Sequence, residues 1–335
     1  MKKEALFYEK NPVGVKCHIC PRECIIPEGK TGFCKSRVNN KGILYTIAYG
    51  NPCAVNVDPV EKKPLLHFLP GSKSLSIATA GCNLSCLNCQ NSTISQKSPM
   101  ETENFDLPPE KVVSLCRQEK CASIAYTYTE PITYYEYTYD TSVIAHQMGI
   151  RNIMVSAGYI NPEPLRKLCK VIDAANIDLK SFSNEIYREL NGVKLQPVLD
   201  TLKTLKDEGV WLEITNLLIP SWNDDTDMIL RMCHWLAENG FENTPLHFSR
   251  FFPMYKLMQS QTTPINTLKN AYNIAINEGL KYVFIGNVPE LNMENTICPK
   301  CHKEVIKRSG YKIQENHIKS GKCGFCGEKI AGIWE

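Results

Sequence analysis

The chain has 335 residues, 43% of them hydrophobic, and a formal net charge of +3. This length suits about two domains, or one barrel with appendages, and so small a charge gives no basic surface for nucleic acid or an anionic membrane. No apolar run approaches the roughly 20 residues that a membrane-spanning helix needs. The sixteen cysteines, in a sequence without an export signal, indicate metal binding in a reducing cytoplasm rather than disulfides.

Residues 1–72 contain four cysteines in the pattern C-x2-C-x3-C-x9-C, namely Cys17, Cys20, Cys24 and Cys34. Glycines between the last two predict loops rather than a helix or a strand. Four thiolates in so short a segment can bind zinc or an auxiliary iron–sulfur cluster. The pattern favours a metal site over unligated thiols and leaves the choice between the two metals open.

A strand is expected over residues 42–49. Residues 57–71 are expected to be irregular because they contain several prolines, with charged residues standing among apolar ones. Two interpretations fit this composition. The segment is either a solvated linker or a loop folded over the mouth of the site that follows it in the sequence.

A strand-like run over residues 74–80 is followed by three cysteines in the pattern C-x3-C-x2-C, namely Cys82, Cys86 and Cys89. A closed zinc site needs four ligands, and no fourth cysteine or histidine appears before Cys116. Three thiolates suit a [4Fe–4S] cluster, which four cysteines normally hold, with one iron left open. The alternatives are a single metal ion completed by a distant cysteine, or unligated core thiols.

This spacing, directly after a strand, resembles the cluster loop of the radical S-adenosylmethionine (SAM) superfamily. The resemblance implies that the amino and carboxylate groups of SAM bind the open iron. It also implies that an electron from the reduced cluster cleaves SAM and leaves a 5′-deoxyadenosyl radical.

Strand-like and helical patterns alternate from there to about residue 287. Glycines stand just past helical patterns and before apolar strands, at Gly149, Gly209, Gly240 and Gly279, as expected of helix C-termini. Repeated βα units predict a parallel sheet, and six or seven in one run favour a barrel, complete or open. The expected strands cover residues 74–80, 123–129, 152–156, 176–179, 210–216, 246–251 and 282–285.

The last segment, residues 291–335, contains two C-x2-C pairs, Cys298 with Cys301 and Cys323 with Cys326. Two such pairs about 20 residues apart are typical of a zinc ribbon; a rubredoxin-like iron is the alternative. The predicted fold is therefore α/β. A partial TIM-type βα barrel of the radical SAM kind, residues 73–290, lies between a cysteine-rich N-terminal segment, residues 1–72, and a zinc-ribbon tail.

Chemistry in parallel α/β barrels sits at the carboxyl ends of the strands, where five side chains stand out. Glu130 is the candidate acceptor for the SAM ammonium, although Thr-Glu-Pro replaces the Gly-Gly-Glu turn that radical SAM proteins often have. Ser156 is placed to hydrogen-bond ribose or carboxylate. Asp178 and Lys180 share a face, either to pair with each other or to contact the cofactor. His247 is a candidate cofactor ligand or a hydrogen-bonded core residue.

Motifs along nearly the whole chain resemble the AmmeMemoRadiSam-system radical SAM proteins, which are similar to pyruvate formate-lyase activating enzyme. One departure concerns the position before the third cluster cysteine, which is usually aromatic and lies near adenine; here it is Asn88. The motifs that carry the resemblance are Asp58-Pro-Val-Glu-Lys-Lys-Pro-Leu-Leu-His-Phe-Leu-Pro-Gly71, Gly81-Cys-Asn, Cys89-Gln-Asn91, Tyr128-Thr-Glu-Pro131, Asp178-Leu-Lys180, Ile219-Pro-Ser-Trp-Asn223, His247-Phe-Ser-Arg-Phe-Phe-Pro253 and Gly321-Lys-Cys-Gly-Phe-Cys-Gly327.

The resemblance implies a cytoplasmic, SAM-cleaving enzyme of unidentified substrate that works where oxygen is scarce. It implies a flavodoxin- or ferredoxin-like electron donor, and Memo-like and AMMECR-like proteins as partners. Two other functions fit the cysteines: an activase that abstracts a glycine α-hydrogen from a partner enzyme, and a non-enzymatic iron–sulfur electron carrier. The carrier hypothesis leaves the βα units with polar strand ends unexplained.

Overall fold

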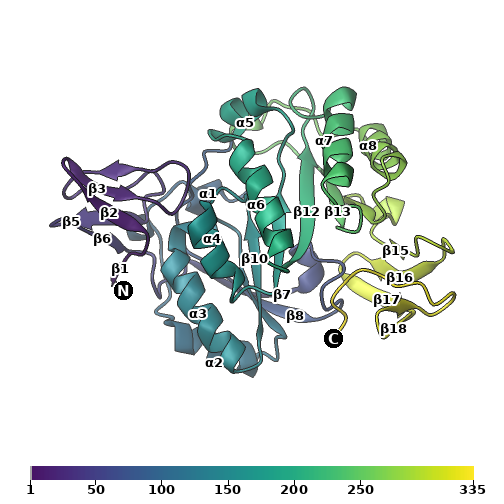
Figure 1. Cartoon of the computed structure of the whole chain (residues 1–335), viewed down its shortest axis with the longest axis horizontal. Helices are drawn as coiled ribbons and strands as arrows, with labels where there is room; N and C mark the ends of the chain where they lie inside the picture. Colours follow the sequence, from purple (N-terminus) through teal and green to yellow (C-terminus); the bar gives the residue numbers. More distant parts are fainter. Residues whose placement is uncertain (1) are drawn as a thin grey trace.

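A computed structural model, which describes residues 2–335, has a parallel sheet at its centre (Figure 1). Its strands pair in chain order, each parallel to the next. They are β8 (Lys73–Ala78), β9 (Ser123–Tyr126), β10 (Arg151–Ser156), β11 (Ala174–Asp178), β12 (Trp211–Leu218), β13 (Leu246–Arg250) and β14 (Val283–Gly286). All seven expected strands are present, and among the described residues β14 pairs only with β13. The predicted α/β partial barrel is confirmed in its open form.

Helices connect these strands and pack beside them (Figure 1). They are α1 (Ser92–Ser95), α2 (Pro109–Gln118), α3 (Tyr135–Gln147), α4 (Pro162–Cys169), α5 (Asn184–Asn191), α6 (Gln196–Asp207), α7 (Thr226–Glu238) and α8 (Ile265–Asn277). The glycine after α3, Gly149, has a φ of 70°, and the one after α8, Gly279, has a φ of 93°. Only glycine adopts this left-handed region without a steric cost, so these glycines end the helices as predicted.

The segment before the barrel differs from its prediction. Residues 54–59, expected in part to be irregular, form strand β7 (Ala54–Pro59), which pairs antiparallel with β8 at the edge of the sheet. The barrel sheet therefore begins before residue 73. The next segment, residues 60–71, contains a short 3-10 helix, η1 (Val60–Lys62), and is called the plug below.

The plug is neither a solvated linker nor a loop over the cluster. Leu65 and Phe68 are 0% and 1% exposed, and they pack against Ala125, Ile153 and Ala174 in the barrel. Because β7 runs antiparallel to β8 and ends opposite the first residue of β8, the plug lies at the amino ends of the parallel strands. It fills the end of the barrel opposite to the one predicted.

Short antiparallel sheets flank the barrel on both sides (Figure 1). The N-terminal part is built from β1 (Lys3–Glu4), β2 (Tyr8–Asn11), β3 (Gly14–Cys17), β4 (Ile25–Ile26), β5 (Arg37–Asn40) and β6 (Ile43–Thr46). Cys17 thus ends a strand, whereas the sequence predicted loops here. β6 lies within the expected strand at residues 42–49.

The C-terminal part contains β15 (Thr296–Ile297), β16 (Glu304–Ser309), β17 (Lys312–Asn316), β18 (Ile318–Lys319) and β19 (Lys322–Cys323). It docks on the plug: Arg308 donates to the carbonyl of Leu66 at 2.7 Å, and the His67 ring contacts the Ala331 carbonyl and the Thr296 hydroxyl at 2.7 and 3.0 Å. Within residues 2–335, no helix has the length and apolar character needed to cross a bilayer.

Candidate functional site

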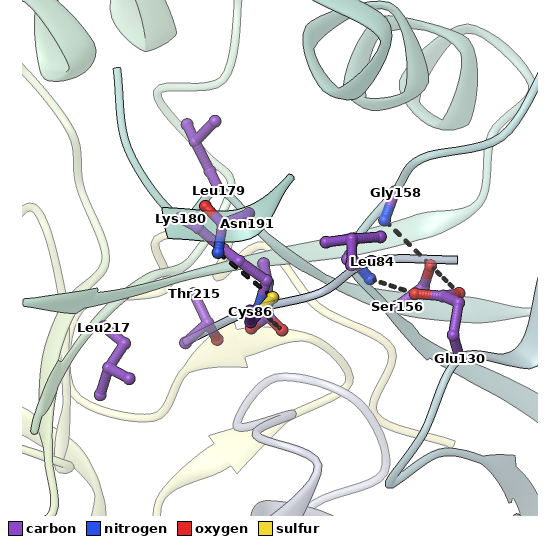
Figure 2. Close-up of polar contacts among 12 residues, drawn as sticks. Leu84, Cys86, Glu130, Ser156, Gly158, Leu179, Lys180, Asn191, Thr215 and Leu217 are labelled. Atoms are coloured by element: carbon purple, nitrogen blue, oxygen red, sulfur yellow. Dashed lines mark hydrogen bonds and ion pairs between the residues drawn. The ribbon is translucent and has the colours of Figure 1, made fainter. Parts of the chain in front are cut away.

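Glu130 lies at the carboxyl end of β9, where the chain turns into the 3-10 helix η3 (Pro131–Tyr134). Its carboxylate is 1% exposed and accepts hydrogen bonds from the Ser156 hydroxyl at 2.7 Å and the Ala157 amide at 2.9 Å. Figure 2 shows Ser156 beside it. Burial raises the pKa of Glu130 to about 7, against the lowering effect of these hydrogen bonds. The Ile132 amide also donates to this carboxylate, at 3.4 Å. A carboxylate has about four lone-pair sites, so this one retains about one for a cationic ligand.

The Ser156 hydroxyl both donates and accepts a hydrogen bond within the protein. It donates to Glu130 and accepts from the amide of Gly158 at 2.9 Å. Ser156 therefore orients the Glu130 carboxylate, a role that the sequence did not indicate.

Asp178 is the last residue of β11 and Lys180 follows the strand, and the two side chains pair with each other at 2.8 Å. Burial lowers the pKa of Lys180, but the Asp178 carboxylate and the Cys86 sulfur outweigh it, so the pKa is raised and the ammonium stays charged. The ion pair that the sequence offered as one alternative is present. This ion pair lies beside the cysteine loop, since Figure 2 shows Lys180 next to Cys86.

The loop that carries Cys82, Cys86 and Cys89 follows β8, and the surrounding chain directs donors at its sulfurs. The Leu84 amide donates to Cys82 at 3.3 Å, and the Asn191 side chain donates to Cys86 at 3.2 Å. The hydroxyl of Ser95, in α1, lies 3.1 Å from the Cys89 sulfur. Such hydrogen bonds are among the means by which proteins tune iron–sulfur clusters.

The spacing of these three sulfurs is wider than that of a single-ion site. Within residues 2–335, the three do not form a group whose ligand atoms all lie within 4.8 Å of one another. Each thiolate of a cubane binds a different iron, so its thiolates stand farther apart than those around one ion. Burial raises the pKa of the Cys82 and Cys86 thiols, and a bound metal would keep such thiols deprotonated. The residues present fit a cluster.

His247 is not brought to this end of the barrel. It is the second residue of β13 and 3% exposed, and its Nε2 lies 2.7 Å from a carboxylate oxygen of Glu213 in β12. The same carboxylate accepts from the backbone amides of Leu66 and His67 in the plug, at 2.9 and 2.8 Å. Of the two alternatives that the sequence left open for His247, the structure shows the hydrogen-bonded core residue rather than a cofactor ligand. Its strand register points it at the plug.

Sequence reasoning missed Asn191, whose side-chain amide donates a hydrogen bond to the Cys86 sulfur. It is the last residue of α5 and lies 105 residues away from that cysteine. No local pattern marks such a residue, because an asparagine at a helix end ordinarily serves the helix itself.

The C-terminal cysteines form a compact group. The Cys298 and Cys326 sulfurs are 3.6 Å apart, those of Cys301 and Cys323 are 3.7 Å apart, and all four lie within 4.8 Å of one another. Zinc–sulfur bonds of about 2.3 Å in a tetrahedron require sulfur separations of about 3.8 Å. The four thiols therefore have the geometry of a site for one tetrahedral ion. The N-terminal cysteines, in contrast, line a shared cavity without forming such a group.

Comparisons with known proteins agree with this architecture. The profile of the Radical SAM superfamily matches residues 76–242. The chain is 48% identical to an uncharacterized protein of Methanocaldococcus jannaschii, over 98% of each chain. It is 28% identical to pyruvate formate-lyase 1-activating enzyme of Escherichia coli K12, over 48% of this chain and 67% of the other. The solved structure of Streptococcus suis SuiB has a TM-score of 0.50 at 14% identity, covering 68% of this chain and 52% of that one.

Two findings point to the same family. The superfamily profile matches the barrel with its cysteine loop, and the chain is similar to an activating enzyme. A domain of this kind implies a [4Fe–4S] cluster and SAM. The protein belongs to the radical SAM superfamily and is an enzyme.

Proposed function

We propose that the protein cleaves SAM reductively at a [4Fe–4S] cluster bound by Cys82, Cys86 and Cys89, and uses the product radical on a substrate not yet identified. A bound cluster supplies the electron that splits SAM into methionine and a 5′-deoxyadenosyl radical. The observation that carries this proposal is the convergence of Glu130 and Lys180 on the cysteine loop. The charge of Glu130 acts on the Cys82 thiol, and that of Lys180 acts on Cys86.

The protein residues divide the work of holding SAM. Glu130 is the acceptor for the SAM ammonium, since it is a buried carboxylate that accepts three hydrogen bonds and has about one lone-pair site left. Ser156 and the Ala157 amide fix the carboxylate in place. Lys180, held by Asp178, supplies a cation near Cys86 that favours the thiolate and outweighs the opposing charge of Asp178.

The test is anaerobic reconstitution with iron and sulfide, followed by SAM and dithionite and by assay of 5′-deoxyadenosine. Replacing the three loop cysteines with alanine is expected to remove about four irons and to abolish 5′-deoxyadenosine formation. The matched control replaces Cys116 and Cys233, which are buried in the apolar core, and should keep both. Cleavage that persists in the triple variant would sink the proposal.

A second candidate is an activase of a glycyl-radical enzyme, supported by the similarity to pyruvate formate-lyase 1-activating enzyme. A glycyl radical in an added partner enzyme, detected by electron paramagnetic resonance, would identify this activity. Membership of an enzyme superfamily disfavours the electron-carrier hypothesis. We further propose a flavodoxin- or ferredoxin-like donor and zinc at the C-terminal cysteines. The AmmeMemoRadiSam assignment, with Memo-like and AMMECR-like partners, stays a prediction.

A further inference from the structure

Four N-terminal cysteines far from the barrel in sequence line one cavity. Cys17 ends β3, Cys20 and Cys24 lie in the turn that follows, and Cys34 lies just before β5. All four, with Ile19, Ile26 and Phe33, border the same cavity. The fold therefore directs four soft ligands into a largely apolar enclosure, which protects a metal centre from water.

Donors from the surrounding chain reach this cavity. The Ser36 hydroxyl, which donates to the Thr133 carbonyl at 2.8 Å, lies 3.2 Å from the Cys34 sulfur, and Arg37 Nη1 lies 3.8 Å from the Cys17 sulfur. Arg37 is 1% exposed and pairs with Glu136 at 2.6 Å, yet its Nε is buried and has no hydrogen-bond partner within residues 2–335. A buried donor without an acceptor is costly. The inorganic sulfides of a cluster are acceptors that a lone zinc ion does not bring.

The spacing of the N-terminal sulfurs does not match a preformed site for a single ion. The C-terminal four meet the distances that one tetrahedral ion requires, and the N-terminal four, also within the described chain, are not all within 4.8 Å of one another. A cubane needs the wider arrangement, because each thiolate binds its own iron.

The cavity lies against the proposed SAM-cluster loop. Asn83, next to Cys82, borders the cavity together with the four cysteines. Arg22 donates to the Asn83 carbonyl at 2.5 Å. On the other side of Cys82, Gly81 has a φ of 104°, and a Cβ there would come 2.4 Å from the Cys34 carbonyl oxygen. Both neighbours of Cys82 thus contact the N-terminal cysteine segment.

We propose that Cys17, Cys20, Cys24 and Cys34 bind a second [4Fe–4S] cluster that passes electrons to the SAM cluster. One electron from a low-potential donor protein of the ferredoxin or flavodoxin class reduces this cluster, and the same electron then reduces the SAM cluster. The donor is oxidised by one electron, and no bond forms or breaks in the transfer. The relay rests on the proposed function, whereas the second cluster does not.

Metal counting on the reconstituted full-length protein tests the site. We expect about eight irons per chain and about one zinc. The variant Cys24→Ser/Cys34→Ser, at the two half-buried positions, should lose about four irons and keep its zinc. The loop variant Cys82→Ala/Cys86→Ala/Cys89→Ala should keep about four irons, those of the N-terminal cluster.

Other counts overturn the proposal. About four irons with about two zincs in the wild type would make the N-terminal site a zinc site, and about four irons with one zinc would leave it without metal. The wild type and the loop variant decide this even if the N-terminal variant does not fold. The SAM-cleavage assay is separate, so its failure would refute the proposed function and leave the second cluster standing.

The relay has its own readout. Dithionite is small and can reduce the SAM cluster directly, so the N-terminal variant should still form 5′-deoxyadenosine with dithionite. With a ferredoxin or flavodoxin as the only reductant, it should form far less than the wild type. Equal rates with the protein donor would refute the relay. Magnetic coupling between the two reduced clusters, seen as broadening of the electron paramagnetic resonance spectrum and lost in either variant, would support their contact.

Discussion

At the scale of single residues, the site depends on how the fold buries and orients the carboxylate of Glu130. Thr-Glu-Pro marks Glu130 as a strand-end residue, so the sequence could predict its position. It could not predict Ser156 as its support, because the two are joined only by the pairing of β9 with β10. The same limit explains His247, for which a strand pattern allows two faces and does not say which end of the barrel the side chain meets.

Replacing Glu130 tests its proposed contact with SAM. A charge-assisted hydrogen bond contributes about 1.5–3 kcal/mol, so Glu130→Ala should weaken SAM binding by about 10- to 100-fold. Glu130→Gln, which keeps an acceptor oxygen but not the charge, should fall between. Titration of SAM into the reconstituted cluster, followed by electron paramagnetic resonance, measures this. Iron content should match the wild type in both variants, and unchanged affinity in Glu130→Ala would make Glu130 a turn residue only.

The pH dependence of SAM binding follows from the same carboxylate. Burial raises the pKa of Glu130 to about 7, so the group is mostly neutral below that pH and charged above it. At pH 6 about one tenth of the protein would carry the charge, and SAM affinity should be about tenfold weaker than its plateau at high pH. Glu130→Gln should bind SAM with little change over the same range. A wild-type affinity that rises as pH falls would contradict the assignment.

At the scale of elements, the strands and helices of the barrel were predictable, and the plug was not. Apolar strand runs and helix-ending glycines are local signals, and they placed all seven strands. The charged residues of segment 57–71 suggested exposure to solvent, because the sequence does not show that they are satisfied within the segment itself. Glu61 accepts from the Gly71 amide at 2.6 Å, and Lys63 pairs with Asp58 of β7 at 2.6 Å. Paired charges can be buried, and sequence does not show the pairing.

Glu213 is the element-scale test, since it joins β12, β13 and the plug. Glu213→Ala would leave two backbone amides and His247 without their acceptor in a buried place, and we expect a loss of about 3–5 kcal/mol in the free energy of unfolding. Glu213→Gln keeps an acceptor for the amides and should lose less. Urea denaturation of the reconstituted protein measures both. A cost below that of an ordinary surface substitution, about 0.5 kcal/mol, would show that the network does not hold the plug.

At the scale of the whole molecule, the cysteine pattern predicted three metal-binding regions but not their relation to the barrel. The N-terminal cysteines lie against the loop after β8, whereas the C-terminal group docks on the plug at the opposite end. Spacing in the sequence reports which ligands are near one another. It does not report the surface on which a small metal-bound unit docks.

Removal of the C-terminal metal should therefore lower the stability of the whole chain. Binding of structural zinc contributes about 10–16 kcal/mol to folding in small peptides, and here the bound unit contacts the plug through Arg308 and Ala331. Cys323→Ser/Cys326→Ser should lower the thermal midpoint of the full-length protein and leave the iron content of the barrel unchanged. Cys169→Ser, at a half-buried thiol in α4, is the matched control. An unchanged midpoint after zinc loss would show that the tail is independent of the barrel.

The plug also limits where a reactive intermediate can go. Leu65 and Phe68 fill the barrel at the amino ends of its strands, and Ile333 of the C-terminal part packs against their cluster. If the proposed radical forms beside the cysteine loop, the plug shields it from solvent on that side. The opposite mouth, beside the cysteine loop, is the one that a substrate of the proposed reaction would occupy. A substrate bound at that mouth would then close it, so that the proposed radical would meet the molecule it is meant to attack before it meets water.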